Sequence, residues 1–126
     1  MKLLFILAVI PLLMVARSGS AAEQTAEEIL KAVVKVRAVI HEDAVTAQSL
    51  GTEREGNGIL IDSAGYILTI GYIILESKTI EVTWSDGQVT DAAFVGYDYD
   101  TGFGLLRAIT SPNIAPMRFG KSSELK

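Results

Sequence analysis

The chain has 126 residues, a single histidine, no cysteine and a formal net charge of −4. Without cysteine it has no disulfide framework, so its stability must come from a packed core. An acidic protein repels phosphate, and no cluster of lysines and arginines offsets that repulsion here. The composition therefore excludes a nucleic-acid-binding protein.

Residues 1–22 have the composition of a secretory signal peptide. Lys2 gives a positive start, an apolar run follows, and small residues precede a predicted cleavage site after Ala22. The apolar run, 3–16, is shorter than the roughly 20 residues of a membrane span, and Pro11 interrupts it. We therefore predict an exported protein, periplasmic or secreted, without membrane attachment after cleavage.

Two patterns open the mature chain. Residues 23–32 form a short N-terminal segment in which Thr25 and Glu28 have the spacing of a capping box, which predicts a helix from Ala26 to Ala32. Residues 33–40 alternate apolar and charged side chains, as a half-buried strand does. The predicted inner face holds Val34, Val36 and Ala38, and the outer face holds Lys35 and Arg37.

Residues 41–58 are polar and contain three glycines, so we predict a long surface loop. Beyond it, short strand patterns follow one another closely. They cover 58–62, 66–70, 79–84, 88–98 and 103–109. Gly65 and the Asp86-Gly87 pair supply hairpin turns between them. About six short strands without a long helical period predict an all-β fold, a small six-stranded antiparallel barrel.

The sequence contains no complete set of residues for a metal site or for a catalytic site. A metal site needs several clustered ligands, whereas Asp98 and Asp100 are two acids beside a turn, so we predict no metal and no cofactor. His41 is either a general base or a solvated loop residue, and its acidic neighbours favour the second interpretation. Ser63, in the stretch IDSAGY, lacks the flanking glycines and the strand-to-helix turn of a nucleophile elbow.

Three stretches carry a family resemblance: GNGILIDSAGYILTIGYII, TIEVTWSDGQVTDAAFVGYDYDTGFGLLRA and APMRFGKSSEL. They resemble the N-terminal barrel of trypsin-like serine proteases of the HtrA (Deg) type. In that family, G-Y-I-L-T-N leads into the catalytic histidine, and V-G-x-D-x-x-x-D-L-A-L-L-K carries the catalytic aspartate. The resemblance implies a Greek-key barrel over 33–120, the first half of a double barrel, and serine endopeptidase activity as the family chemistry.

Carried over position by position, the family's histidine falls on Tyr72 and its aspartate on Gly102, whereas Asp98 matches an earlier, structural aspartate. The family's nucleophilic serine lies in the second barrel, which would follow Lys126, so we expect it to be absent. Residues 121–126 correspond to the start of the linker toward that absent barrel.

These replacements remove the proton-transfer chemistry of the triad. The histidine must accept a proton and return it, which requires a pKa near neutrality. A tyrosine phenol has an unperturbed pKa of about 10. Gly102 offers no carboxylate that would orient a base. We therefore expect a pseudoenzyme without peptidase activity.

Four functions stay open at the level of sequence. The first is an inactive protease fold that binds extended peptides or protein segments. The second is one half of a truncated two-barrel protein with no independent function. The third is a protease whose partner chain supplies the whole triad, and the fourth is an exported barrel of unrelated origin. The sequence carries no signal of the oligomeric state.

Overall fold

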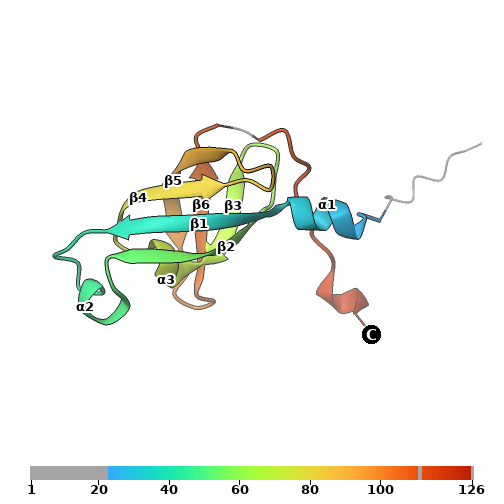
Figure 1. Ribbon diagram of the computed structural model, residues 1–126. Coiled ribbons are helices and arrows are strands. Elements are labelled where there is room, and N and C mark those ends of the chain that lie inside the picture. The colour runs from blue at the N-terminus through green and yellow to red at the C-terminus, as the bar shows by residue number, and fades with distance from the viewer. Residues whose placement is uncertain (1–22, 111, 126) are drawn as a thin grey trace, which may run out of the picture.

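Six antiparallel strands close into a barrel in the computed structural model, which describes residues 23–110 and 112–125 (Figure 1). The strand order around the barrel is β1-β2-β3-β6-β5-β4. The strands are β1 (Val33–Ile40), β2 (Glu53–Leu60), β3 (Tyr66–Ile70), β4 (Ser77–Thr83), β5 (Val89–Tyr97) and β6 (Phe103–Ala108). The predicted six-stranded barrel is confirmed. The predicted signal peptide lies outside the described residues.

The predicted N-terminal helix is confirmed as α1 (Ala26–Lys31), which begins with the expected capping box. The Glu28 amide donates to the Thr25 hydroxyl at 3.2 Å, and the Thr25 amide donates to the Glu28 carboxylate at 3.4 Å. Just before α1, Gln24 hydrogen-bonds with Pro116 and Arg118. Helix α1 and the C-terminal segment therefore lie at the same end of the barrel (Figure 1).

The predicted loop over 41–58 is wrong in its second half, because residues 53–57 belong to β2. Cross-strand pairing explains the difference. The Lys35 ammonium lies 3.2 Å from the Glu55 carboxylate, and Arg37 pairs with Glu53, so the charges of this polar stretch neutralise those of β1. The connection between β1 and β2 is thus shorter, and it contains a single helical turn, α2 (Ala47–Leu50).

Between β3 and β4 the chain makes one turn of helix, α3 (Gly71–Ile74), which the sequence pattern did not predict. Ile73 and Ile74 are buried in the core, so α3 packs against the strands from within. It fits because two strand positions lack a Cβ. A Cβ on Gly56 would lie 2.1 Å from Ile73 Cδ1, and one on Gly104 would lie 2.7 Å from Ile74 Cδ1.

The remaining core comes from the inward faces of the strands. Its largest fully buried side chains, apart from those of α3, are Val34, Val36, Ile40, Leu60, Ile67, Val82 and Leu106. Among the described residues, no helix is long and apolar enough to span a membrane. A short 3-10 turn, Ser122–Glu124, follows the barrel near the C-terminus.

Glycine at position 58 provides a test of this packing. A Cβ there would lie 2.6 Å from Ile67 Cγ2 and 3.2 Å from the Leu68 carbonyl oxygen. We expect Gly58→Ala to lower the free energy of unfolding by about 1–3 kcal/mol, as overpacked cores do. Urea titration followed by circular dichroism measures the change. Gly120→Ala is the control, since nothing lies within 4 Å of its added Cβ, and equal effects of the two variants would contradict this packing.

Candidate functional site

The structure brings α3, which contains Tyr72, into contact with Gly102 in the turn between β5 and β6. The Gly71 amide, next to Tyr72, donates a hydrogen bond to the Gly102 carbonyl at 2.7 Å. Gly102 has a φ of +78°, in the left-handed region that favours glycine. The β5–β6 turn is therefore built around a glycine, and an aspartate at 102 would have to adopt a backbone conformation that side chains disfavour.

Aromatic side chains occupy this corner of the molecule. A Cβ on Gly71 would lie 1.9 Å from Tyr97 Cε2, so the Tyr97 ring fills the space directly beside α3. The Tyr97 and Tyr99 rings meet edge to face, with their centroids 4.6 Å apart. Tyr72 itself is 48% exposed, although both of its neighbours in α3 are buried. This surface can pack against a ligand and donate hydrogen bonds to it.

Asp98 stabilises the turn that contains Gly102. Its carboxylate accepts hydrogen bonds from the Asp100 amide at 3.0 Å and the Thr101 hydroxyl at 2.9 Å. These bonds lower the pKa of Asp98, with the Asp100 amide as the largest cause. The Asp98 carboxylate thus has its partners within the turn. In the described part of the chain, no three metal-ligating side chains come together.

Arg54 holds α3 from the inside of the barrel, and sequence analysis missed this residue. Its guanidinium is 5% exposed and donates to the carbonyls of Tyr72 at 2.6 Å and Leu75 at 3.2 Å. It also donates to the Thr46 hydroxyl at 2.8 Å. Charged neighbours in the sequence made Arg54 appear solvated. Its inward direction would have been evident only from recognising 53–57 as a strand with alternating faces.

Glu76 ties the β1–β2 loop to the segment that follows α3. Its carboxylate accepts hydrogen bonds from the amides of Val45 and Thr46, at 3.0 and 3.1 Å, and from the Thr46 hydroxyl at 2.9 Å. The Thr46 hydroxyl is the largest cause of the lowered pKa of Glu76. Glu76 is also the only described non-glycine residue with a positive φ, +61°.

The other residues considered from the sequence lie elsewhere. His41 is exposed in the β1–β2 loop, where it lines a polar hollow with Asp43 and Glu76. Ser63 belongs to the β2–β3 hairpin, which Asp62 stabilises by accepting hydrogen bonds from two backbone amides. The His41 amide donates a hydrogen bond to the Glu76 carbonyl at 3.4 Å. Among the described residues, no hydrogen bond links the side chain of His41 or of Ser63 to Tyr72 or Gly102.

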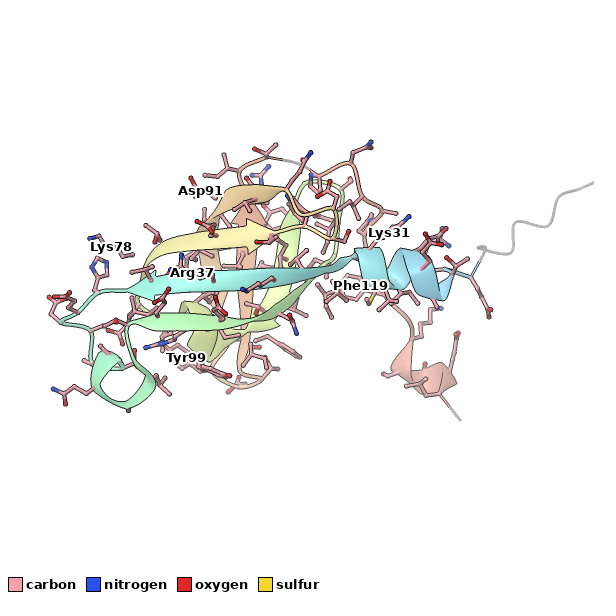
Figure 2. The ribbon with its side chains drawn as sticks, viewed as in Figure 1. Lys31, Arg37, Lys78, Asp91, Tyr99 and Phe119 are labelled. Atoms are coloured by element: carbon pink, nitrogen blue, oxygen red, sulfur yellow. The ribbon has the colours of Figure 1, made fainter. Side chains whose placement is uncertain are left out.

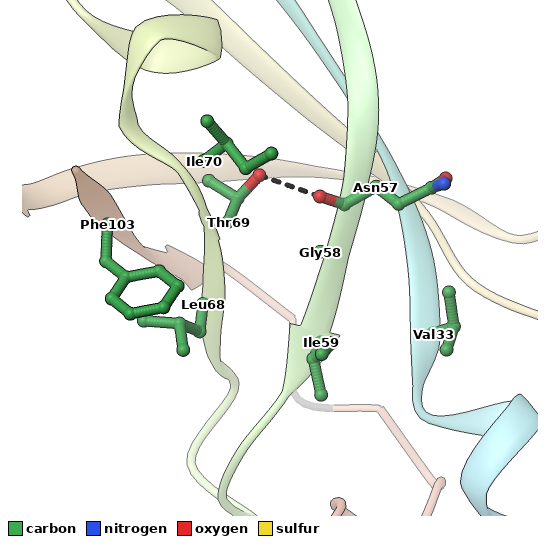
Figure 3. Close-up of a pocket in the computed structure, with 8 residues that line it drawn as sticks. All are labelled: Val33, Asn57, Gly58, Ile59, Leu68, Thr69, Ile70 and Phe103. Carbon is green, nitrogen blue, oxygen red and sulfur yellow. Dashed lines mark hydrogen bonds between the residues drawn. The ribbon is translucent and has the colours of Figure 1, made fainter. Parts of the chain in front are cut away.

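An apolar hollow of about 250 Å³ lies on the outside of the barrel (Figure 3). It is lined by Val33, Asn57, Gly58, Ile59, Leu68, Thr69, Ile70 and Phe103. At its upper edge the Thr69 hydroxyl donates to the Asn57 carbonyl at 2.8 Å. Ile70 and Phe103 are about half exposed, so this surface of β3 and β6 presents apolar side chains to its surroundings.

The chain is similar in sequence to known serine endoproteases. The chain is 35% identical over 71 residues to the probable periplasmic serine endoprotease DegP-like of Chlamydia pneumoniae, covering 56% of this chain and 14% of that protein. It is 31% identical over 72 residues to the periplasmic serine endoprotease DegP of Salmonella typhimurium, covering 56% and 15% of the two chains. Over its barrel, this chain is related to the HtrA-type, trypsin-like serine proteases.

Two further comparisons agree with this relationship. The mitochondrial serine protease HTRA2 of Drosophila ananassae is 30% identical over 95 residues, which cover 74% of this chain and 22% of that protein. A solved structure of an HtrA-type protease with a tripeptide superposes with a TM-score of 0.66 at 23% identity, covering 79% of this chain and 30% of the other. No family model matches the chain. The chain spans less than a quarter of the length of these curated relatives.

The lowered pKa of Glu76 predicts a pH-dependent contribution to stability. A carboxylate whose pKa is lower in the folded than in the unfolded state stabilises the protein above its ordinary pKa, near 4.5, and loses that contribution as the pH falls through the folded value. We expect Glu76→Gln to lower the urea midpoint at pH 7 and to make little difference at pH 3. An equal loss at both pH values would show that the carboxylate charge is not responsible.

Proposed function

We propose that this protein is an exported, non-catalytic relative of HtrA-type proteases that binds extended polypeptide at the Tyr72 turn. The observation that carries the proposal is the hydrogen bond from the Gly71 amide to the Gly102 carbonyl, which places the helical turn that contains Tyr72 beside the β5–β6 turn. A half-exposed tyrosine and a glycine occupy the positions to which the resemblance assigns the family's histidine and aspartate. Because a tyrosine and a glycine do not supply the histidine base and the orienting carboxylate of a triad, these residues favour binding over peptide hydrolysis.

A free stretch of strand edge next to α3 supports an extended ligand. β2 pairs with β1 along 53–59, but with β3 only along 58–60. In an antiparallel ladder, alternate residues direct their backbone groups to opposite sides. The residues of β2 before 58 therefore direct half of their amides and carbonyls to a side with no strand beside it, although Thr69 already donates to the Asn57 carbonyl. A peptide added there would be held by main-chain hydrogen bonds.

Export is supported by two independent observations. Residues 1–22 carry the charge and hydropathy pattern of a signal peptide. The DegP-type relatives are named as periplasmic proteins. The mature protein would then act in the periplasm or outside the cell, and the partner class that we propose is an extended peptide or protein segment rather than a folded domain.

The proposal predicts binding without turnover. Purified protein should hydrolyse fluorogenic casein at the background rate, and a serine-directed inhibitor should not change that rate. It should bind fluorescein-labelled reduced casein, an extended polypeptide, in an anisotropy titration. We expect Tyr72→Ala to weaken this binding about tenfold, because an aromatic anchor contributes on the order of 1–2 kcal/mol at a binding surface.

Phe119→Ala is the matched control. Phe119 is an exposed aromatic residue near α1 (Figure 2). The aromatic surface beside Tyr72, to which Tyr99 belongs, lies on the side of the barrel that holds α3 (Figure 2). This variant should bind casein as the unmodified protein does. Inhibitor-sensitive hydrolysis above background would refute the non-catalytic part of the proposal. Equal weakening by both variants would refute the assignment of the binding site to Tyr72.

A second candidate function rests on the apolar hollow of Figure 3. In this alternative, the outer surface of β3 and β6 is an interface for a second barrel, and the described barrel has no independent function. Half-exposed Ile70 and Phe103 support it, because contiguous apolar patches on soluble proteins commonly mark interaction sites.

The second candidate predicts that the barrel alone is poorly soluble. It should bind the dye ANS and self-associate at micromolar concentration in analytical ultracentrifugation. Phe103→Lys should reduce both properties, while Phe119→Lys, on an exposed side chain away from the hollow, should not. A soluble monomer that does not bind ANS would count against this candidate and leave the peptide-binding proposal standing.

A further inference from the structure

The hydroxyl of Thr46 lies between a buried cation and a carboxylate. Its oxygen accepts a hydrogen bond from Arg54 Nη2 at 2.8 Å and donates one to Glu76 Oε1 at 2.9 Å. Thr46 belongs to the β1–β2 loop, Arg54 to β2, and Glu76 to the segment after α3. One side chain thus joins three parts of the chain that are well separated in sequence.

The guanidinium of Arg54 extends this connection to both ends of α3. It donates to the carbonyl of Tyr72, in the first half of the turn, and to that of Leu75, directly after it. It also donates to the Gly51 carbonyl at 3.3 Å, at the end of the loop. An unbroken series of hydrogen bonds therefore runs from the loop, through Arg54, to the backbone of the exposed Tyr72.

The backbone of Glu76 shows that this arrangement is under strain. Its φ of +61° is uncommon for a residue with a side chain, and such conformations persist where the surroundings impose them. Here the surroundings are the two loop amides and the Thr46 hydroxyl that bind the carboxylate. Without them, Glu76 would be free to return to a negative φ and to reorient the preceding residues.

We infer that residues 41–52 form a latch on the Tyr72 turn. With the loop docked through Thr46, residues 71–76 are held in the strained arrangement that places Tyr72 at the surface. With the loop displaced, residues 71–76 relax and Tyr72 leaves that position. The β1–β2 loop and α3 therefore open together as one local unit, whatever ligand the surface around Tyr72 binds.

Amide hydrogen exchange of Thr46→Val tests the latch, because valine keeps the shape of threonine and removes only the hydroxyl. We expect exchange to accelerate about tenfold in both 41–52 and 71–76, and at the Ile40 amide, which donates to the Thr52 carbonyl. The other amides of β1 and those of β6 should keep their rates. Thr46→Ser should retain the slow exchange. Thr52→Val is the control within the same loop, because its hydroxyl makes no hydrogen bond in the described structure, and we expect it to have no effect.

The variant Glu76→Gly distinguishes the latch from a nonspecific loss of stability in the loop and the turn. Glycine adopts a φ near +61° without strain, so this variant should free the loop while the turn stays protected. The inference is overturned if Thr46→Val accelerates the loop alone, or if it accelerates all amides equally. It is also overturned if Glu76→Gly accelerates the turn as much as the loop. Because none of these measurements uses a peptide, their failure would leave the peptide-binding proposal untouched.

Discussion

The insertion of one helical turn into the barrel is the contact on which the rest of the structure depends. Ile73 and Ile74 fill the core from within, and they fit because Gly56 and Gly104 have no Cβ. The same insertion exposes Tyr72, because a single turn of helix with two buried faces directs its remaining side chain outward. Core packing and the proposed binding surface are therefore two consequences of one local geometry, and a change to either affects the other.

Around this turn, the backbone and the packing suit the residues that are present. The Tyr97 ring occupies the space beside Gly71, and Gly102 uses a backbone conformation that suits glycine. Restoring a histidine at position 72 alone would supply a base without the carboxylate that orients it. Restoring an aspartate at 102 would strain the turn. The surface around Tyr72 contains the aromatic rings of Tyr97 and Tyr99, which suit packing against other groups more than acid–base chemistry.

The outside of the barrel has two contrasting surfaces. Across β2, β1 and β4, acidic and basic side chains alternate, and the neighbouring carboxylates raise the pKa of Arg37, with Glu53 as the largest cause. Such exposed pairs contribute little to stability, but they suit contact with water. Across β3 and β6, apolar side chains surround the hollow beside Phe103. The first surface is therefore charged, whereas the second leaves Ile70 and Phe103 about half exposed.

The local sequence pattern alone predicted several elements of the secondary structure. The capping box at Thr25, the alternation over 33–40 and the positive-φ glycine at 65 depend on neighbours a few residues away, and the structure has them where the sequence predicted them. The burial of Arg54 and its connection to Glu76 through Thr46 appeared only in the tertiary structure. Those contacts join residues 8 and 30 positions apart, and no local periodicity predicts which distant strand or loop will supply a partner.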